Sequence, residues 1–326
     1  MGFKDGTSGT FKRIGRIQEI GVITALVVLY LILGISTEHF FDFNNLVSIL
    51  RASSYMGIMA LGMVFVLSER DVDLSVGGIY NLTGLVTALM LVKGLPILLA
   101  ILVGIMVGMA CGLLNFGLSV AFKIPTIIIT LGTMSVYKGF GLVISQASPI
   151  YKFSRESWFV NIVGKNLFGK IPTGVVVLLV LTVILALVYG FTIFGTRVRA
   201  IGSNPEAAKF SGININKYRA MVFALMGALC AVASTLEVAF LQAGNPSMGG
   251  GIEMMVIAAA IIGGTSLAGG QGSIIGALIG AVIISVIRNG IVQLGVNIYW
   301  SSTVTGFVII AAVAVDYLFK RRKLSS

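Results

Sequence analysis

The sequence predicts an all-α polytopic membrane protein with about ten transmembrane helices, and three observations lead to that class. Of the 326 residues, 57% are apolar and only 11% are charged, whereas a soluble domain carries about 25% charged residues. The mean hydropathy is +1.01. The apolar residues also form long segments, not the short alternating segments of an outer-membrane barrel. A bundle of helices that crosses a bilayer several times is therefore expected.

Ten apolar segments approach the length of about 20 residues that one crossing needs. The third and the eighth are short, and polar or glycine-rich stretches adjoin them, Glu69–Ser75 and Gly263–Ser273. These stretches are either ordinary capped turns or the ends of broken helices that face a pathway. The expected spans are residues 20–35, 46–67, 74–91, 97–120, 124–144, 174–194, 218–240, 254–264, 273–287 and 300–319.

The basic residues predict the orientation, because cytoplasmic loops carry an excess of lysine and arginine. The net charge is +11, and most of the 23 basic residues fall inside if both termini are cytoplasmic. The division is then a cytoplasmic segment 1–19, a transmembrane domain 20–319 with a cytoplasmic loop 195–217 and a long outer loop 145–173, and a basic cytoplasmic tail 320–326. The loops outside hold only five basic residues: Lys93, Lys152, Arg155, Lys165 and Lys170.

Two of the spans carry glycines at four-residue spacing, which places the glycines on one face where another helix can pack closely. One span is third among spans two to five, and the other is third among spans seven to ten. Since the two run in opposite directions, they predict an inverted repeat. The alternative is coincidence in a chain with 41 glycines. The helix-packing glycines are Gly104, Gly108, Gly112, Gly272, Gly276 and Gly280.

Polar residues inside or beside the spans are candidates for a substrate pathway. Each could instead bond a neighbouring helix or backbone group. No span shows the central acid or histidine chain that a proton relay requires. A pathway lined by amides and hydroxyls fits a neutral, polyhydroxylated solute better than an ion. The candidates are Asp73, Ser75, Asn81, Asn115, Thr133, Thr265 and Ser266.

No chemistry of its own is expected from this chain. No catalytic triad, paired carboxylates or metal-ligand cluster is present, so neither catalytic residues nor a metal site is predicted. Gly164–Lys170 matches most of a phosphate-binding loop, but Ile171 stands where a Ser or Thr would bind magnesium, and no strand precedes the loop. No cofactor is expected, and the basic residues indicate membrane orientation, not nucleic-acid binding.

The stretch Gly195–Ile213 is the longest run without an apolar block in the second half of the chain. Asn204 is a good N-cap, Pro205 suits the first helical position, and Glu206 lies at the positive end of the helix dipole. Gly212 is expected to end the helix after roughly two turns. The sequence therefore predicts a short, capped helix on a charged cytoplasmic loop.

Three long motifs resemble those of one family. RAIGSNPEAAKFSGI is similar to the cytoplasmic coupling motif of permease subunits of ATP-binding-cassette (ABC) importers for monosaccharides such as ribose, xylose, arabinose and galactose. SERDVDLSVGGIYNLTG and GNPSMGGGIEMMVIAAAIIGGTSLAGGQGSIIGALIGA resemble two further segments of that family. The resemblance covers about residues 20–319. Glu69 and Arg70 depart from it, because small or uncharged residues are expected there.

The resemblance implies a subunit that passes a monosaccharide, ribose-like first, inward across the bacterial plasma (inner) membrane. The implied partners are an ABC ATPase with two fused nucleotide-binding domains that binds ATP and magnesium, an extracytoplasmic sugar-binding protein, and a second permease copy, identical or a close paralogue. An ion-coupled secondary transporter of a small neutral solute is the alternative. The resemblance assigns the ATPase-coupling role to Arg199, Gly202, Asn204, Pro205, Glu206, Ala207, Ala208, Ser211 and Gly212.

Overall fold

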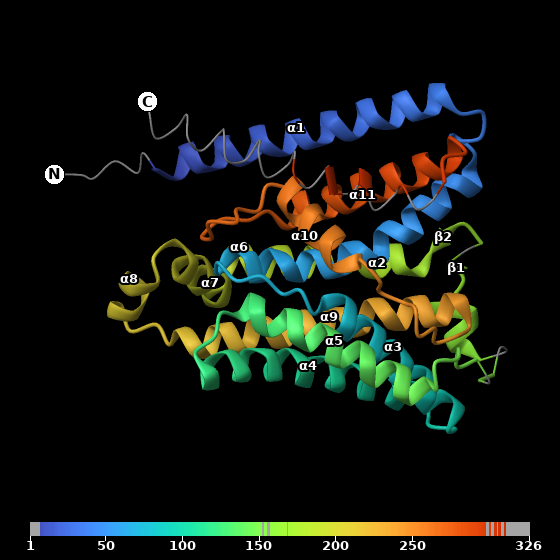
Figure 1. Cartoon of the computed structure of the whole chain (residues 1–326). Coiled ribbons are helices and arrows are strands. Elements are labelled where there is room, and N and C mark those ends of the chain that lie inside the picture. The colour runs from blue at the N-terminus through green and yellow to red at the C-terminus, as the bar shows by residue number, and fades with distance from the viewer. Residues whose placement is uncertain are drawn as a thin grey trace.

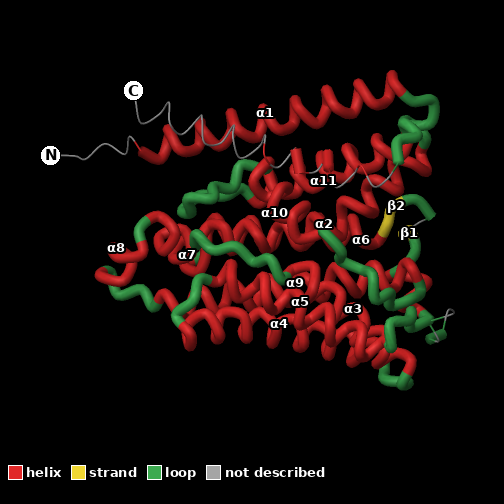
Figure 2. The backbone as a smooth tube through the Cα atoms, viewed as in Figure 1, coloured by secondary structure: helices red, strands yellow, loops and turns green. Residues whose placement is uncertain are grey.

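The computed structural model describes residues 7–151, 153–154, 157–167, 169–297, 300, 303–304, 306–307 and 310, and it describes side chains from residue 20 onward. This part of the chain is almost entirely helical (Figure 2). The expected span at 300–319 lies mostly outside the described residues. The helices run roughly side by side as one bundle (Figure 1).

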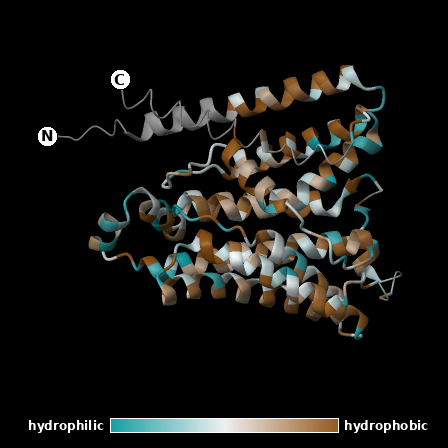
Figure 3. Cartoon of the chain, viewed as in Figure 1, coloured by the Kyte–Doolittle hydropathy of each residue, from teal (hydrophilic) through white to brown (hydrophobic). Residues whose placement is uncertain are grey.

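Six helices are long and apolar enough to cross a membrane. They are α2 (Phe43–Ser68), α4 (Ile97–Phe122), α5 (Thr126–Ser145), α6 (Thr173–Phe191), α9 (Ile215–Leu241) and α11 (Ile274–Gln293). Three shorter apolar helical stretches join them: residues 20–36 of α1 (Thr7–Ser36), α3 (Val76–Val92) and α10 (Ile252–Ile262). The expected spans one to nine each correspond to one of these elements. Figure 3 shows apolar residues along the helices and polar residues gathered toward the ends of the bundle.

The core lies where α2 and α9 pack together, and α9 also packs against α3. In the most apolar part of α2 78% of the residues are buried, and in α9 72%, against 22% in α5 and 28% in α4 and α6. Since α4, α5 and α6 turn large apolar side chains outward, they form the periphery of the bundle. Such an outward apolar surface is expected of helices that face lipid.

The remaining elements lie at the two ends of the bundle. At one end, α7 (Ile193–Ser203) and α8 (Pro205–Phe210) project beyond the other helices (Figure 1). At the opposite end, the expected long loop contains a short π-helix, Phe159–Val163, and a hairpin of β1 (Asn166–Leu167) with β2 (Ile171–Pro172). The sequence did not predict α7, because its charged residues are typical of a loop between membrane spans.

The glycine stripes lie at close helix contacts. A β-carbon at Gly108 or Gly112 of α4 would overlap a carbonyl oxygen of α9, that of Gly227 or Phe223. Gly104 faces Thr87 of α3 instead. On the second stripe, Gly276 and Gly280 of α11 lie against backbone carbonyls of Gly263 and Ala259, at and near the end of α10, while Gly272, before α11, lies against Val64, Ser68 and Tyr189. Backbones approach this closely only where side chains are absent.

Two connections between helices run through the interior of the bundle as non-helical segments. The chain from α2 to α3 runs beside the start of α5, where Thr126 donates to the carboxylate of Asp71 (2.7 Å) and the N–H of Leu74 donates to Thr130 Oγ1 (3.1 Å). The chain from α9 to α10 runs along α3, from Gly244 beside Ala88 to Gly249 beside Gly77. Both α3 and α10 are short because part of each crossing is made by these extended segments.

We expect Gly108→Val to destabilise the protein by about 1–3 kcal/mol, because an added side chain must push α4 away from α9. The matched control is Gly117→Val on the same helix, where no atom lies within 4 Å of an added β-carbon. Thermal unfolding of the detergent-solubilised protein measures both. Equal melting temperatures for the two variants would show that the close α4–α9 contact contributes nothing to stability.

Candidate functional site

The projecting helix α8 has the local structure that its sequence predicts. The side chain of Asn204 accepts a hydrogen bond from the N–H of Ala207 (3.1 Å), Pro205 occupies the first helical position, and Glu206 lies in the first turn. Gly212 follows the helix with φ = +79°, a backbone conformation that glycine adopts without strain. The capped helix is confirmed, and it ends at Phe210.

Only part of the motif on α8 faces solvent. Ala208 is buried against Ile201 and Tyr218 in a small apolar cluster. Glu206, Ala207, Lys209 and Ser211 are exposed. Phe210 is 91% exposed, and sequence reasoning did not single it out. The helix is therefore held to the bundle by an apolar cluster on its inner side, while Phe210 stands exposed on its outer side.

Arg199 on α7 lies half-buried and bonded within its own chain. Its guanidinium donates to the carbonyl oxygen of Tyr189 and lies 5.0 Å from the centre of the Tyr189 ring. This contact fixes α7 to the end of α6, since Tyr189 belongs to the last turns of that helix. Arg199 therefore joins α7 to the bundle in this structure.

Three backbone segments meet at the C-terminal end of α7, in what we term the junction. They are residues 68–70 at the end of α2, residues 202–203 of α7, and residues 269–270 in the connection from α10 to α11. The N–H of Gly270 donates to the carbonyl of Ser68 (2.8 Å). The guanidinium of Arg70 donates to the carbonyl of Ser203 (2.7 Å). A β-carbon at Gly202 would overlap the Ser68 carbonyl oxygen. The two departures from the family pattern, Glu69 and Arg70, lie in this junction.

The acidic residues after α2 are buried. Asp71 pairs with Arg219 of α9 (3.3 Å), whereas neither carboxyl oxygen of Glu69 has a hydrogen-bond partner among the described residues. The pKa of Glu69 is raised to about 9, chiefly by burial and also by the nearby charge of Asp71, while the charge of Arg219 opposes the rise. Burial also raises the pKa of Asp71. Glu69 is therefore protonated at neutral pH.

The residues predicted to line a substrate pathway lie in buried hydrogen-bonding networks or in connections between helices. The carboxylate of Asp73 accepts from Ser75, Ser75 Oγ accepts from Asn115, and Asn115 accepts from Tyr137. Asn81 donates to backbone carbonyls of the α9–α10 connection, at 2.9 Å from Pro246 and 3.1 Å from Met248. Three others are also buried and lie within helix α5 or the α10–α11 connection: Thr133, Thr265 and Ser266.

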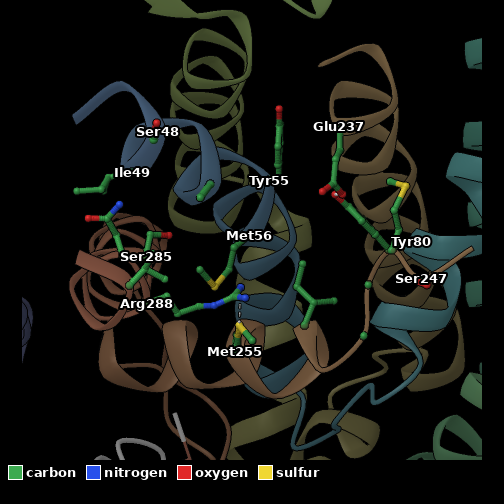
Figure 4. A pocket seen from close by; sticks show the side chains of 17 residues that line it. Ser48, Ile49, Tyr55, Met56, Tyr80, Glu237, Ser247, Met255, Ser285 and Arg288 are labelled. Carbon is green, nitrogen blue, oxygen red and sulfur yellow. Dashed lines mark hydrogen bonds between the residues drawn. The ribbon is translucent and has the colours of Figure 1, made fainter. Parts of the chain in front are cut away.

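A cavity of about 430 Å³ lies between α2, α9, α10 and α11, in the half of the bundle away from α8. None of the seven pathway candidates lines it. Figure 4 shows Arg288 of α11 extending toward Met255, while Glu237 of α9 meets Tyr80 of α3 on another side. The polar residues that line the cavity are Ser48, Tyr55, Tyr80, Glu237, Ser247, Ser285, Arg288 and Asn289.

Two ordinarily charged side chains line this cavity. Glu237 lies near the end of α9, partly buried, where it accepts a hydrogen bond from Tyr80. Arg288 lies inside α11 on the cavity surface. Neither residue was among the pathway candidates from sequence, although a charge within a span is costly in lipid and often marks a pathway.

Comparison with known proteins finds one matching family, described as branched-chain amino acid transport system / permease component, over residues 45–313. The ribose import permease protein RbsC of Bacillus subtilis (strain 168) is 36% identical and is matched over 93% of this chain and 94% of its own. RbsC of Escherichia coli (strain K12) is also 36% identical, over 92% and 94%. The D-allose transport system permease protein AlsC of the same strain is 37% identical, over 93% of each chain.

A solved structure of low sequence identity shares the fold. It is described as an inward-facing conformation of an ABC transporter of metal-chelate type, and it has a TM-score of 0.55 and 16% sequence identity. The match covers 92% of this chain and 98% of that one. At this identity the likeness concerns the arrangement of helices.

The raised pKa of Glu69 predicts a pH-dependent stability. Folding favours the protonated carboxyl, so the stability that this preference contributes is complete below the ordinary pKa of 4.5 and declines as pH rises toward 9. Glu69→Gln is expected to flatten the decline in melting temperature between pH 5 and pH 9. The control is Glu38→Gln, at an exposed site. Parallel melting curves for Glu69→Gln and the unmodified protein would contradict a buried, neutral Glu69.

Proposed function

We propose a transport cycle for this chain from one premise: it belongs to the family of branched-chain amino acid transport system / permease components. It is a multi-pass membrane permease subunit of an ABC importer and not an enzyme. The family description names amino acids, whereas the two kinds of relative described above transport ribose and D-allose according to their names. Their similarity over more than nine-tenths of both chains carries the assignment to monosaccharides, with ribose as the first candidate.

Membership implies an ATPase partner and a substrate-binding protein. In the proposed complex the ATPase has two fused nucleotide-binding domains and supplies the ATP and magnesium sites, and a second permease copy completes the pathway. The complex lies in the bacterial inner membrane with both termini and α8 in the cytoplasm. The excess of basic residues on that side supports this orientation, and it places the cavity in the outer half of the membrane.

The proposed contact with the ATPase is helix α8. Its exposed surface combines Glu206, Ala207 and Lys209 with the bare side chain of Phe210. A large aromatic side chain that enters a pocket is the usual energetic centre of a protein interface, and charged neighbours then set the register. Ala208 and Gly202 act from beneath, because Ala208 holds α8 onto Ile201 and Gly202 permits the close packing on Ser68.

The junction at the end of α7 supports a path by which movement of the ATPase reaches the inside of the bundle. A displacement of α7 acts on the α2–α3 connection through Arg70 and on the α10–α11 connection through Gly269 and Gly270. These connections lead into α3 and α11, which line the cavity with Tyr80 and Arg288. In the proposed cycle, movement of α8 therefore changes both the inner connections and the cavity walls.

An inverted repeat of spans two to five and seven to ten is part of the proposal. Its support is a matching set of contacts in the two halves: α4 packs on α9 as α11 packs on α2, and α3 contacts α4 as α10 contacts α11. The glycines of α4 and α11 occupy corresponding places in this scheme. Two structurally similar halves of opposite orientation are a common basis for alternating access.

The function is tested by uptake of labelled D-ribose and D-allose into proteoliposomes that contain the permease, its ATPase and its binding protein. Uptake of at least one sugar is expected to require ATP and the binding protein, and to persist when ionophores collapse ion gradients. Uptake driven by an ion gradient without ATP would support the secondary-transporter alternative. Failure of both sugars would remove the ribose-like assignment.

The coupling role of α8 predicts that Glu206→Lys or Ala207→Asp leaves the protein folded and abolishes ATP-driven uptake, because a reversed or added charge is placed in the contact. Phe210→Ala is expected to weaken copurification of the ATPase about tenfold or more. The control is Lys217→Ala, an exposed cation just outside α8. Normal uptake and full ATPase copurification by these α8 variants would refute the coupling assignment.

A further inference from the structure

One wall of the cavity is a polar face of α11. Ser285, Arg288 and Asn289 are three and four residues apart, so they lie on the same side of the helix. Neither Ser285 Oγ nor Asn289 Oδ1 has a hydrogen-bond partner among the described residues. The amide nitrogen of Asn289 donates to Asn45 (2.7 Å), which fixes the orientation of the amide. Buried polar atoms are normally satisfied, so two open ones on a cavity wall indicate a polar occupant.

Arg288 strengthens this indication. Its guanidinium lies 3.4 Å from the sulfur of Met255, a weak acceptor. No carboxylate lies within 4.0 Å of the guanidinium in the described part of the chain. A cation inside a membrane span is expensive unless it faces water or a polar partner. The position of Arg288 on the cavity therefore fits a solvated solute route.

A second wall presents an acceptor. Glu237 of α9 is held by the hydroxyl of Tyr80, whose side chain is almost fully buried on α3. Glu237 and Arg288 are the two residues with ordinarily charged side chains among those that line the cavity. Their charges are opposite and offset each other. Between the two walls lie apolar side chains, among them Ile49, Met56 and Met248.

We propose that this cavity is a contact site for the monosaccharide in transit, with Glu237 accepting hydrogen bonds from sugar hydroxyls and with Arg288, Ser285 and Asn289 bonding the hydroxyls on the opposite side. The proposal rests on the function proposed above and assigns residues to it. Each sugar hydroxyl is both donor and acceptor, so it can bond either wall, and the apolar side chains can cover the C–H surfaces of the ring.

The same chemistry selects against charged solutes. An anionic sugar acid or sugar phosphate that reached Arg288 would bring its charge near Glu237, and a cationic amino sugar beside Glu237 would approach Arg288. A neutral polyol leaves the two protein charges balanced. The cavity volume of about 430 Å³ lies within the roughly 300–1,000 Å³ of ordinary small-molecule sites. The site is accordingly assigned to neutral pentoses and hexoses.

The first experiment measures uptake by the complete complex with Glu237→Gln or Arg288→Gln. Removing a hydrogen bond to a charged group is expected to lower the uptake rate about tenfold or more. Basal ATP hydrolysis and copurification of the ATPase report on folding and assembly. The control is Lys138→Gln, a lysine within α5 that does not line the cavity. If the complex with the unmodified permease transports sugar and both cavity variants transport it at the same rate, the proposed contact site is wrong, while the proposed function still stands.

A second experiment is independent of ATP coupling. A single cysteine at position 285 is introduced as Ser285→Cys, with Cys111→Ala and Cys230→Ala, and the purified complex is treated with a small polar thiol reagent. D-ribose or D-allose at millimolar concentration is expected to slow modification severalfold, and a bulky disaccharide is not. The reference is Ser36→Cys at the end of α1. The proposed contact site is wrong if neither monosaccharide slows modification of the cysteine at position 285. It is also wrong if the monosaccharides slow modification at position 36 as much as at position 285.

Discussion

A polypeptide that leaves helical form within a membrane must find hydrogen-bond partners inside the protein, because lipid offers none. This constraint organises the bundle. Asn81 of α3 bonds three backbone carbonyls of the α9–α10 connection, and Thr130 of α5 bonds the N–H of Leu74 in the α2–α3 connection. Both connections need surrounding helices, so α3 and α5 pack closely around them. The buried side chains of Asn81 and Thr130 thus support the extended segments.

Glycine residues allow the backbones of neighbouring helices to come into close contact. Where α4 meets α9, and where α11 meets α10, a β-carbon on the stripe glycines would overlap a carbonyl oxygen of the neighbouring helix. The same close contact recurs at Gly202 near the end of α7, where the carbonyl of Ser68 occupies the space of a side chain. Packed backbones are stiff and shift as units, because a dense interior has little room for gradual deformation. The junction is suited to pass displacement from α7 to two inner connections.

Sequence patterns that involve only neighbouring residues predicted some helices correctly and missed others. Asn204, Pro205 and Gly212 predicted α8 because caps and helix ends depend on neighbouring residues. Helix α7 was missed, since its apolar residues Val198 and Ile201 are few and are buried only by tertiary packing. The bundle, its six long helices and the short α10 followed from hydropathy and length. Their pairing in space was accessible only through the glycine spacing.

The candidate functional residues show the same contrast between local and tertiary information. Asn81 and Asn115 were candidates for the pathway, but a sequence does not state whether an amide bonds a solute or a neighbouring carbonyl, and here both bond within the protein. Glu237 and Arg288 are 51 residues apart in the chain and belong to different helices, so their common cavity follows only from the fold. The amides bond other groups of the protein, and the two ordinarily charged side chains line the cavity. A pathway for a neutral solute can therefore contain charges, provided that they are paired in number and set on opposite walls.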